Sequence, residues 1–95
     1  MIGIKVRFMG TFRWASGTEE TEIEIPEQAN VRKALEVLFT QTEELRSIAG
    51  ENTRLDPRPN IIVLVNEVEI GLLRGLETSL QAGDTLTLIP TAHGG

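Results

Sequence analysis

Apolar and polar residues alternate in the first quarter of the chain. Residues 2–9 and residues 18–25 both follow a period of two, with basic residues at the polar positions of the first segment and glutamates at those of the second. This period is typical of a strand with one buried face. A turn around residues 14–17 makes the two strands a hairpin in which opposite charges can face each other. Phe12 and Trp14, beside this turn, are expected to cap the core rather than to serve recognition.

The spacing of apolar residues becomes helical after Pro26, which ends the second strand. Asn30 is a candidate N-cap, and the apolar residues after it fall on one side of a helix. This side continues to residue 49, so the helix either extends to about that point, with Gly50 as a left-handed stop, or breaks near Thr40 into two pieces. The residues on this side are Val31, Ala34, Leu35, Leu38, Phe39, Thr42, Leu45, Ile48 and Ala49.

The second half of the chain returns to strands. Residues 50–60 hold two prolines, a glycine and two asparagines, a composition typical of a loop. The run 61–65 is apolar on both faces and rich in β-branched residues, which predicts a buried strand, and a turn at residues 66–67 leads to a short return strand. After an irregular stretch, Gly83-Asp84 precedes the last strand. The glycine is expected to supply the turn conformation and the aspartate to bond its own backbone.

The order of elements is therefore β-hairpin, helix, strand, short return and strand. One helix lying across one face of a mixed four- or five-stranded sheet accommodates these elements and leaves the other face open, which is an α+β layer architecture. This order is that of the β-grasp fold. We expect one β-grasp domain over residues 1–90 and a flexible C-terminal tail over residues 91–95.

The open face of this sheet is a candidate docking surface. If the odd-numbered residues of 61–65 pack under the helix, then Ile62, Leu64 and Ile89 lie on the exposed face near the tail. An apolar patch there, rimmed by polar residues, would mark a partner site. The alternatives are a face covered by the 50–60 loop or one buried in a homodimer. A one-residue shift of register would exchange the two sets of residues.

Composition narrows the possible partners. The 95 residues suffice for one domain, and 40% hydrophobic with 24% charged residues is ordinary for a globular protein. A net charge of −5 with only two lysines argues against direct nucleic-acid binding and suits a partner with a basic docking surface. The longest apolar run, residues 61–65, is too short to span a membrane, and no leader-like segment precedes the first strand.

Catalytic and metal-binding chemistry has few candidates in this chain. The absence of cysteine excludes disulfides, thiolate zinc sites and cysteine nucleophiles. The one histidine, His93, lies in the tail and cannot complete a Ser-His-Asp arrangement within the domain. The glutamates of residues 19–27 alternate with apolar residues, which indicates a solvated strand face rather than a metal site. We therefore predict neither a metal site nor catalytic residues.

The sequence ends in Gly94-Gly95, directly after the last predicted strand. Because glycine loses more backbone freedom on ordering than any other residue, a paired-glycine end is expected to stay mobile. It offers a carboxylate on a slim stem that can enter a narrow channel of another protein. The alternative is an incidental end without chemistry.

Three pieces of sequence around the last strand form a joint pattern: Val65-Asn66, then Leu80-x-x-Gly83-Asp84-x-Leu86-x-Leu88-x-Pro90, then Gly94-Gly95. Together they resemble the ubiquitin-like sulfur-carrier family, which includes the ubiquitin-related modifiers, the small subunit of molybdopterin synthase and the thiamine-pathway sulfur carrier. The resemblance covers nearly the whole chain. The ending 91–95 is similar to that of the ubiquitin-related modifiers, whereas Ile89-Pro90 is similar to the molybdopterin subunit.

This resemblance implies a protein substrate rather than an enzyme, with no bound cofactor and a cytoplasmic location. An ATP-dependent adenylating enzyme of the ubiquitin-activating type would activate the carboxylate of Gly95. Attack by a persulfide, the sulfur donor, would give a thiocarboxylate for tRNA thiolation, and attack by a lysine of a target protein would give an isopeptide conjugate. In the molybdopterin alternative the same tail would enter a large catalytic subunit. The third possibility is an interaction module whose tail has no chemistry.

Gly94 and His93 are the other candidate recognition residues of the tail. The tail would lie extended in a tight channel beside the nucleotide, where a Cβ at the glycines would clash. His93 could form a hydrogen bond within the activating enzyme, tune the terminus locally, or remain a solvated tail residue.

Overall fold

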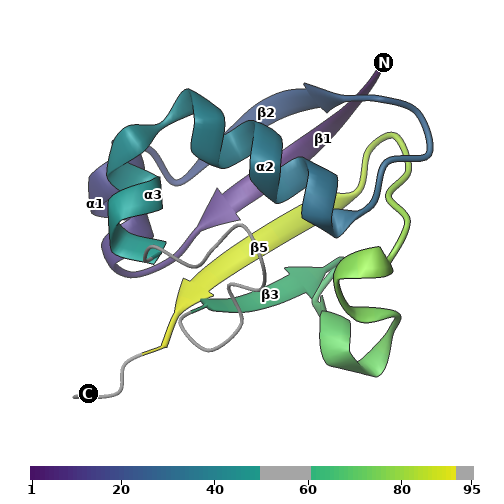
Figure 1. Cartoon of the computed structure of the whole chain (residues 1–95). Helices are drawn as coiled ribbons and strands as arrows, with labels where there is room; N and C mark the ends of the chain where they lie inside the picture. Colours follow the sequence, from purple (N-terminus) through teal and green to yellow (C-terminus); the bar gives the residue numbers. More distant parts are fainter. Residues whose placement is uncertain (50–60, 92–95) are drawn as a thin grey trace.

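The computed structural model describes residues 1–49 and 61–91 as a two-layer α+β fold. The elements are β1 (Ile2–Phe8), α1 (Thr11–Ser16), β2 (Glu20–Ile25), α2 (Val31–Gln41), α3 (Glu43–Ala49), β3 (Ile61–Val65), β4 (Val68–Glu69), the 3-10 turns η1 (Ile70–Leu72) and η2 (Gly75–Glu77), and β5 (Thr85–Pro90). The strands form one five-stranded sheet in the order β2-β1-β5-β3-β4, and α2 and α3 cover one of its faces (Figure 1). This arrangement confirms the predicted β-grasp fold.

The last strand, β5, occupies the middle of the sheet. It pairs in parallel with β1, from Lys5 opposite Thr85 to Phe8 opposite Leu88. On its other side it runs antiparallel to β3, with Ile62 opposite Ile89. The described chain therefore reaches Thr91 from the middle strand of the sheet, which is bonded on both sides (Figure 1).

The predicted pairing of the first two strands is confirmed, and it brings their charges together. Lys5 lies opposite Glu22, and Arg7 lies opposite Glu20. Lys5 Nζ forms a diagonal ion pair with Glu20 Oε1 at 3.6 Å. Both side chains are about half exposed, so the pair contributes at most about 1 kcal/mol.

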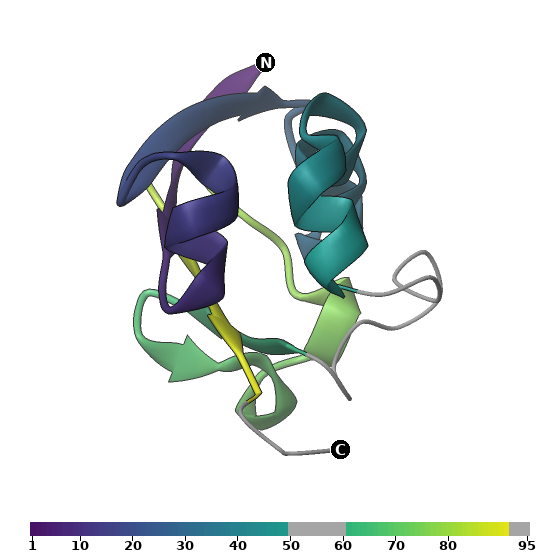
Figure 2. The ribbon, with the colours of Figure 1, turned by 90° about the vertical axis from the view of Figure 1, so that its left-hand side faces the viewer.

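The connection between these strands contains a helix, so the turn predicted at residues 14–17 is wrong. Helix α1 begins after Gly10 and ends at Ser16, where the N–H of Gly17 donates to the carbonyl of Arg13 at 2.9 Å. Phe12 is fully buried, as expected, but Trp14 is 89% exposed and does not cap the core. Figure 2 shows α1 beside the α2–α3 layer at one end of the sheet, and α1 contacts α3.

The main helical segment has the predicted cap and the second of the two predicted forms. Asn30 Oδ1 accepts from the N–H of Lys33 at 2.9 Å. The helix breaks at Thr42, whose backbone is extended, close to the expected point. The predicted stop at Gly50, the side chains of Ile48 and Ala49, and the loop predicted over 50–60 lie outside the described residues. The described apolar residues of the predicted stripe are all buried: Val31, Ala34, Leu35, Leu38, Phe39 and Leu45.

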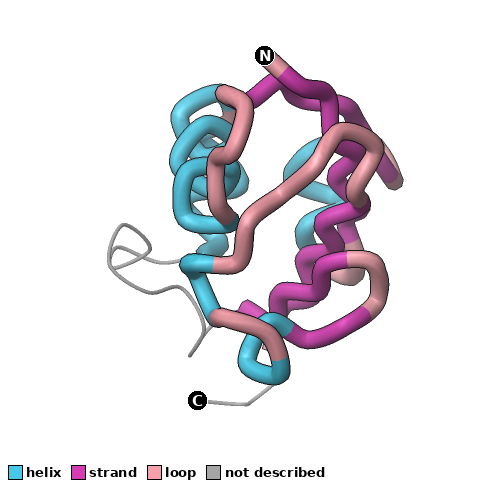
Figure 3. The backbone as a smooth tube through the Cα atoms, turned by 90° about the vertical axis from the view of Figure 1, so that its right-hand side faces the viewer, coloured by secondary structure: helices cyan, strands magenta, loops and turns pink. Residues whose placement is uncertain are grey.

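The core lies between these helices and one face of the sheet. The three central strands contribute side chains that are at most 2% exposed: Ile4, Val6, Phe8, Ile61, Val63, Leu86 and Leu88. Residues 78–84 pass from η2 back to the start of β5, between the helices and the sheet (Figure 3). Leu80 is buried on this path, and its N–H donates to the carbonyl of Ala29 at 2.9 Å. The path therefore closes one side of the core.

A small polar cluster connects the β3–β4 turn to the start of β5. Asn66 and Glu67 form a tight turn with φ of 50° and 71°. Asn66 Nδ2 donates to Asp84 Oδ1 at 3.0 Å, and Asp84 Oδ2 accepts from the N–H of Gln81 at 2.8 Å. Gly83 has φ 86°, a conformation that favours glycine. Gly83 therefore supplies the turn conformation as predicted, and the structural role of Asp84 consists of bonds to the backbone of Gln81 and to the side chain of Asn66.

Candidate partner-binding face and the base of the tail

The sheet face opposite the helices carries the three predicted docking residues. Since strand residues alternate between faces and Val63 and Leu88 are buried beneath the helices, the residues beside them in sequence point to the open face. Ile62 is 39% exposed, and Leu64 and Ile89 are half-buried. The face assignment is therefore confirmed, and Ile62 and Ile89 lie in register. That this face binds a partner stays a prediction.

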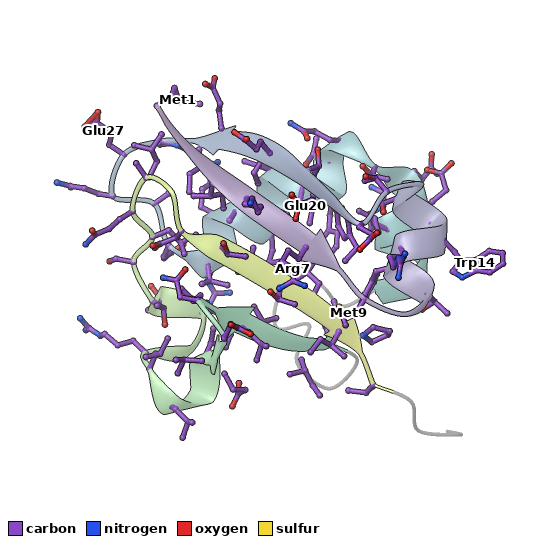
Figure 4. All side chains as sticks on the ribbon, turned by 180° about the vertical axis from the view of Figure 1, so that it is seen from behind. Met1, Arg7, Met9, Trp14, Glu20 and Glu27 are labelled. Atoms are coloured by element: carbon purple, nitrogen blue, oxygen red, sulfur yellow. The ribbon has the colours of Figure 1, made fainter. Side chains whose placement is uncertain are left out.

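Two further residues on this side were not among the predicted docking residues. Figure 4 views the sheet from behind and shows Arg7 over the middle of the sheet and Met9 just beyond the end of β1. Met9 is 41% exposed, and its N–H donates to the carbonyl of Leu88 at 3.1 Å. The alternation of residues 2–9 contains the signal, because it places Lys5, Arg7 and Met9 on one side. We call Met9, Ile62, Leu64 and Ile89 the open patch.

Thr87 is a polar residue that is buried on this face. It stands in register with Arg7 on one side and Leu64 on the other, and it is only 5% exposed. Since the residue points away from the core, we attribute its burial to the larger side chains of these two neighbours. Its hydroxyl has no hydrogen-bond partner among the described residues, a state that costs about 1–3 kcal/mol for a buried polar group.

Arg7 gives the open face a positive charge at its centre. Glu20, which lies opposite in the sheet, is paired with Lys5 instead, and Arg7 has no ion pair within residues 1–49 and 61–91. A hollow of about 410 Å³ beside it is lined by Lys5, Arg7, Glu20, Asn66, Glu67 and Thr85. The face thus combines an apolar patch, the guanidinium of Arg7 and an acidic border along β2. This combination can accept a partner with both apolar and charged groups.

The described part of the chain contains neither a metal cluster nor a membrane helix. Among residues 1–49 and 61–91, no group of three or more His, Cys, Asp or Glu side chains could hold a metal ion. None of the helices described is long and apolar enough to cross a membrane.

The base of the tail is held on both sides. Pro90 ends β5 opposite Ile61, and Thr91 is the last residue described. On the other side lies Gly10, with φ 54°, and a Cβ on Gly10 would come within 3.0 Å of Pro90 Cγ. Glycine is therefore favoured here, since a side chain would be strained at this positive φ and crowded by Pro90. His93, Gly94 and Gly95 lie outside the described residues, so their predicted roles stay predictions.

Known proteins are similar to this chain in fold, and the similarity in sequence extends to the end of the chain. The family model described as "ThiS family" matches residues 6–95. The chain belongs to the ThiS family. This match begins inside β1 and includes the last residue of the sequence.

Two relatives of this ThiS-family protein align over nearly their whole length. The ubiquitin-related modifier 1 homolog of Caenorhabditis elegans is 26% identical over 99% of this chain and 97% of its own. The small archaeal modifier protein 3 of Haloferax volcanii is 29% identical over 97% of this chain and 98% of its own. Both relatives are named modifiers.

Solved structures resemble this ThiS-family protein to a similar degree. Small archaeal modifier protein 1 of Methanosarcina acetivorans is 27% identical with a TM-score of 0.82, over 100% of this chain and 98% of that chain. A Pyrococcus furiosus protein provisionally named molybdopterin converting factor, subunit 1, is 27% identical with a TM-score of 0.77, over 97% and 100%. A chain of the Amycolatopsis orientalis BexX/CysO complex is 25% identical with a TM-score of 0.69, over 97% and 99%. Such neighbours therefore include a chain solved in complex with a protein partner.

Proposed function

We propose that this ThiS-family protein is a sulfur carrier and protein modifier whose reactive group is the carboxylate of Gly95. One observation carries the proposal: the family match continues through β5 to Gly94-Gly95, so the likeness includes the tail as well as the domain. The two modifier relatives, aligned over nearly their whole length, support it. The fold supplies a central strand that leads to this tail from a fixed base.

The proposed chemistry begins with adenylation by a partner enzyme. The Gly95 carboxylate attacks the α-phosphorus of ATP and pyrophosphate leaves, which gives an acyl-adenylate. This step is needed because a carboxylate has oxide as its leaving group, whereas an acyl-adenylate releases AMP. The ATP belongs to the adenylating enzyme, and no cofactor bound to this chain is required.

Sulfur then replaces the AMP. The terminal sulfur of a protein persulfide attacks the carbonyl carbon, AMP leaves, and an acyl disulfide forms. In this acyl disulfide one sulfur is bonded to the Gly95 carbonyl and the other belongs to the donor's cysteine. A second thiol attacks the cysteine sulfur, which forms a disulfide with the donor and releases Gly95 as a thiocarboxylate. If a lysine amine of a target protein attacks the activated carbonyl instead, AMP leaves and an isopeptide bond results. The same activated terminus thus serves both the carrier role and the modifier role.

The open patch and the tail have separate tasks in this proposal. Ile62, Leu64 and Ile89 bind the body of the protein to the adenylating enzyme, while Gly94-Gly95 enters its channel, where a Cβ would clash. His93 contributes to recognition of the tail. Because Pro90 is held against Gly10, binding at the open patch also directs the tail.

The small subunit of a molybdopterin synthase is a second candidate. The similar Pyrococcus furiosus structure favours it, together with Ile89-Pro90 at the end of β5. In this case the thiocarboxylate of Gly95 enters a large catalytic subunit and gives its sulfur to a pterin precursor. A stable one-to-one complex with such a subunit would assign the protein to this pathway.

Intact mass tests the reactive terminus directly. The protein is purified from its native host without reductive or acidic treatment, beside a variant lacking Gly94-Gly95. We expect a species heavier by one oxygen-for-sulfur exchange, localised to Gly95 and absent from the variant. Larger covalent species containing this chain, also absent from the variant, would add the modifier role.

The proposal fails if every molecule carries an ordinary carboxylate and no conjugates form. The decisive condition is one in which the host's adenylating enzyme, ATP and a persulfide donor are all supplied. In that case the protein is an interaction module whose tail has no chemistry.

A further inference from the structure

The most unusual exposed side chain of the protein is its only tryptophan. Trp14 projects from α1 and is 89% exposed (Figure 4). Tryptophan is large and mostly apolar, so it is well buried in most folded proteins. Where it stays exposed it often anchors a partner, since it is enriched among the residues that dominate binding energy. Neither the fold nor the open patch uses Trp14.

Helix α1 fixes the backbone that carries this indole. Phe12, two residues earlier, is fully buried in the core. The helix ends in a backbone hydrogen bond from Gly17 to Arg13, and it packs against α3, whose Leu45 is also fully buried. A partner that binds Trp14 therefore meets a side chain whose backbone is already ordered, which lowers the entropic cost of binding.

Trp14 forms one wall of a hollow between α1 and α3. The hollow has a volume of about 560 Å³ and is lined by Thr11, Trp14, Ala15, Glu44 and Ser47. It thus combines an indole, a small apolar side chain and two hydroxyls with a single carboxylate, that of Glu44.

The negative charge of Glu44 is not balanced within the described residues. The two nearby arginines have acidic partners of their own: Arg13 pairs with Glu19 at 3.3 Å, and Arg46 pairs with Glu43 at 3.7 Å. Glu44 has no ion pair in residues 1–49 and 61–91. An exposed indole next to such a carboxylate is complementary to a cation with an apolar stem.

We propose that this hollow binds an arginine side chain presented by a protein partner. The guanidinium group stacks on the indole of Trp14 and forms an ion pair with Glu44, while the methylene groups contact Ala15. Arginine suits the site better than lysine because its planar group can stack on an aromatic face and bind a carboxylate through two parallel hydrogen bonds. The site is formed by α1 and α3 and shares no residue with the open patch, so it goes beyond the proposed function and does not depend on it.

The test is a titration with the blocked tripeptide acetyl-Gly-Arg-Gly-amide, followed by NMR at the Trp14 indole N–H. The matched probe replaces arginine with citrulline, which keeps the shape and removes the charge. We expect a saturable shift with the arginine peptide, and affinity at least about fivefold weaker for the citrulline peptide and for the Glu44→Gln variant. Trp14→Ala, followed at the Ala15 amide, should abolish binding.

Two control variants separate this site from general effects. Glu24→Gln removes the same charge from an exposed position on β2, and Leu72→Ala removes another side chain that is 80% exposed. Both should bind the arginine peptide as the unmodified protein does. The proposal is overturned if the two peptides give equal shifts, if no saturation occurs, or if Glu24→Gln weakens binding as much as Glu44→Gln.

Two other occupants would also overturn it. If the Trp14 signal of the free protein moves on dilution, a second copy of the chain fills the hollow. If it moves when Arg54 and Arg58 are replaced by glutamine, the chain's own arginines fill it. An unchanged signal in both experiments leaves the hollow free for a partner, as the proposal requires.

Discussion

The two faces of the sheet are built from alternate residues of the same strands, yet they differ in what they contribute. On the helix side, Val63 and Leu88 are fully buried in the core. On the open side, their sequence neighbours Ile62 and Ile89 lie in register, and Ile62 keeps 39% of its surface exposed. Burial stabilises the fold only where water is excluded. The apolar residues of the open face therefore contribute less to folding, and a binding partner is the better reason for them.

The largest difference between the faces should appear when one neighbour at a time is truncated. Leu88→Ala removes a fully buried side chain and should lower the free energy of unfolding by about 2–5 kcal/mol. Ile89→Ala, one residue further on, should cost less, about 1–2 kcal/mol, because its side chain keeps part of its surface exposed. Urea unfolding followed by circular dichroism measures both. Tryptophan fluorescence is a poor probe of unfolding here, since Trp14 is already exposed.

Equal losses for the two variants would show that the open face is covered in solution. Concentration-dependent unfolding would then assign the cover to a second copy of the chain.

A loss of stability of intermediate size is expected at the polar cluster of Asn66 and Asp84. This cluster joins the β3–β4 turn to β5 and so supports the register between β3 and β5. Asp84→Ala removes the acceptors for Asn66 Nδ2 and for the N–H of Gln81, and should destabilise the fold by about 1–3 kcal/mol. Amide hydrogen exchange of Thr85, whose N–H donates to Asn66 Oδ1 at 2.9 Å, should speed up. Unchanged exchange at Thr85 would mean that strand pairing alone fixes this register.

The smallest effect, and the only stabilising one, is expected at Thr87. It is the exception to the comparison, because it points to the open side and is nevertheless buried, with a hydroxyl that has no partner among the described residues. Thr87→Val replaces that hydroxyl with a methyl group of similar size, and should raise the free energy of unfolding by about 1 kcal/mol. The substitution is not expected to change strand pairing, which a matching set of NMR amide shifts for β3 and β1 would verify. A loss of stability would show that a bound water satisfies the hydroxyl.

Local patterns predict most of this architecture, because β1, β2, β5 and the main helical segment have a clear period and β3 is a short β-branched run. The conditional assignment of Ile62 and Ile89 to the open face is correct, although residues 61–65 are apolar throughout and do not decide it, and Asn30 marks the start of α2. Helix α1 escapes such patterns, since six residues make fewer than two turns and show no period. Its position depends on the approach of Gly10 to Pro90, which lie near opposite ends of the sequence.

The same limit applies to the candidate sites. The sequence predicts three residues of the open patch, and the alternation of residues 2–9 places Met9 on the same side. The burial of Thr87, by contrast, depends on the parallel pairing of β5 with β1. The exposure of Trp14 depends on helix α1, which the sequence pattern does not reveal. Without that helix, Trp14 lies beside a turn, where an aromatic residue is expected to pack inward. Contacts between distant segments decide both cases.

Adenylation kinetics test most directly the claim that the open face binds the enzyme that acts on the tail. Pyrophosphate release by the host's adenylating enzyme is measured for Ile62→Asp and for Val68→Asp. Val68 is a matched control because it is also 39% exposed, while its register with Val65 places it on the helix side of the sheet. We predict that Ile62→Asp raises KM about tenfold with little change in kcat, as expected for the loss of about 1.4 kcal/mol of binding. Val68→Asp should behave as the unmodified protein, and an unchanged KM for Ile62→Asp would contradict the account.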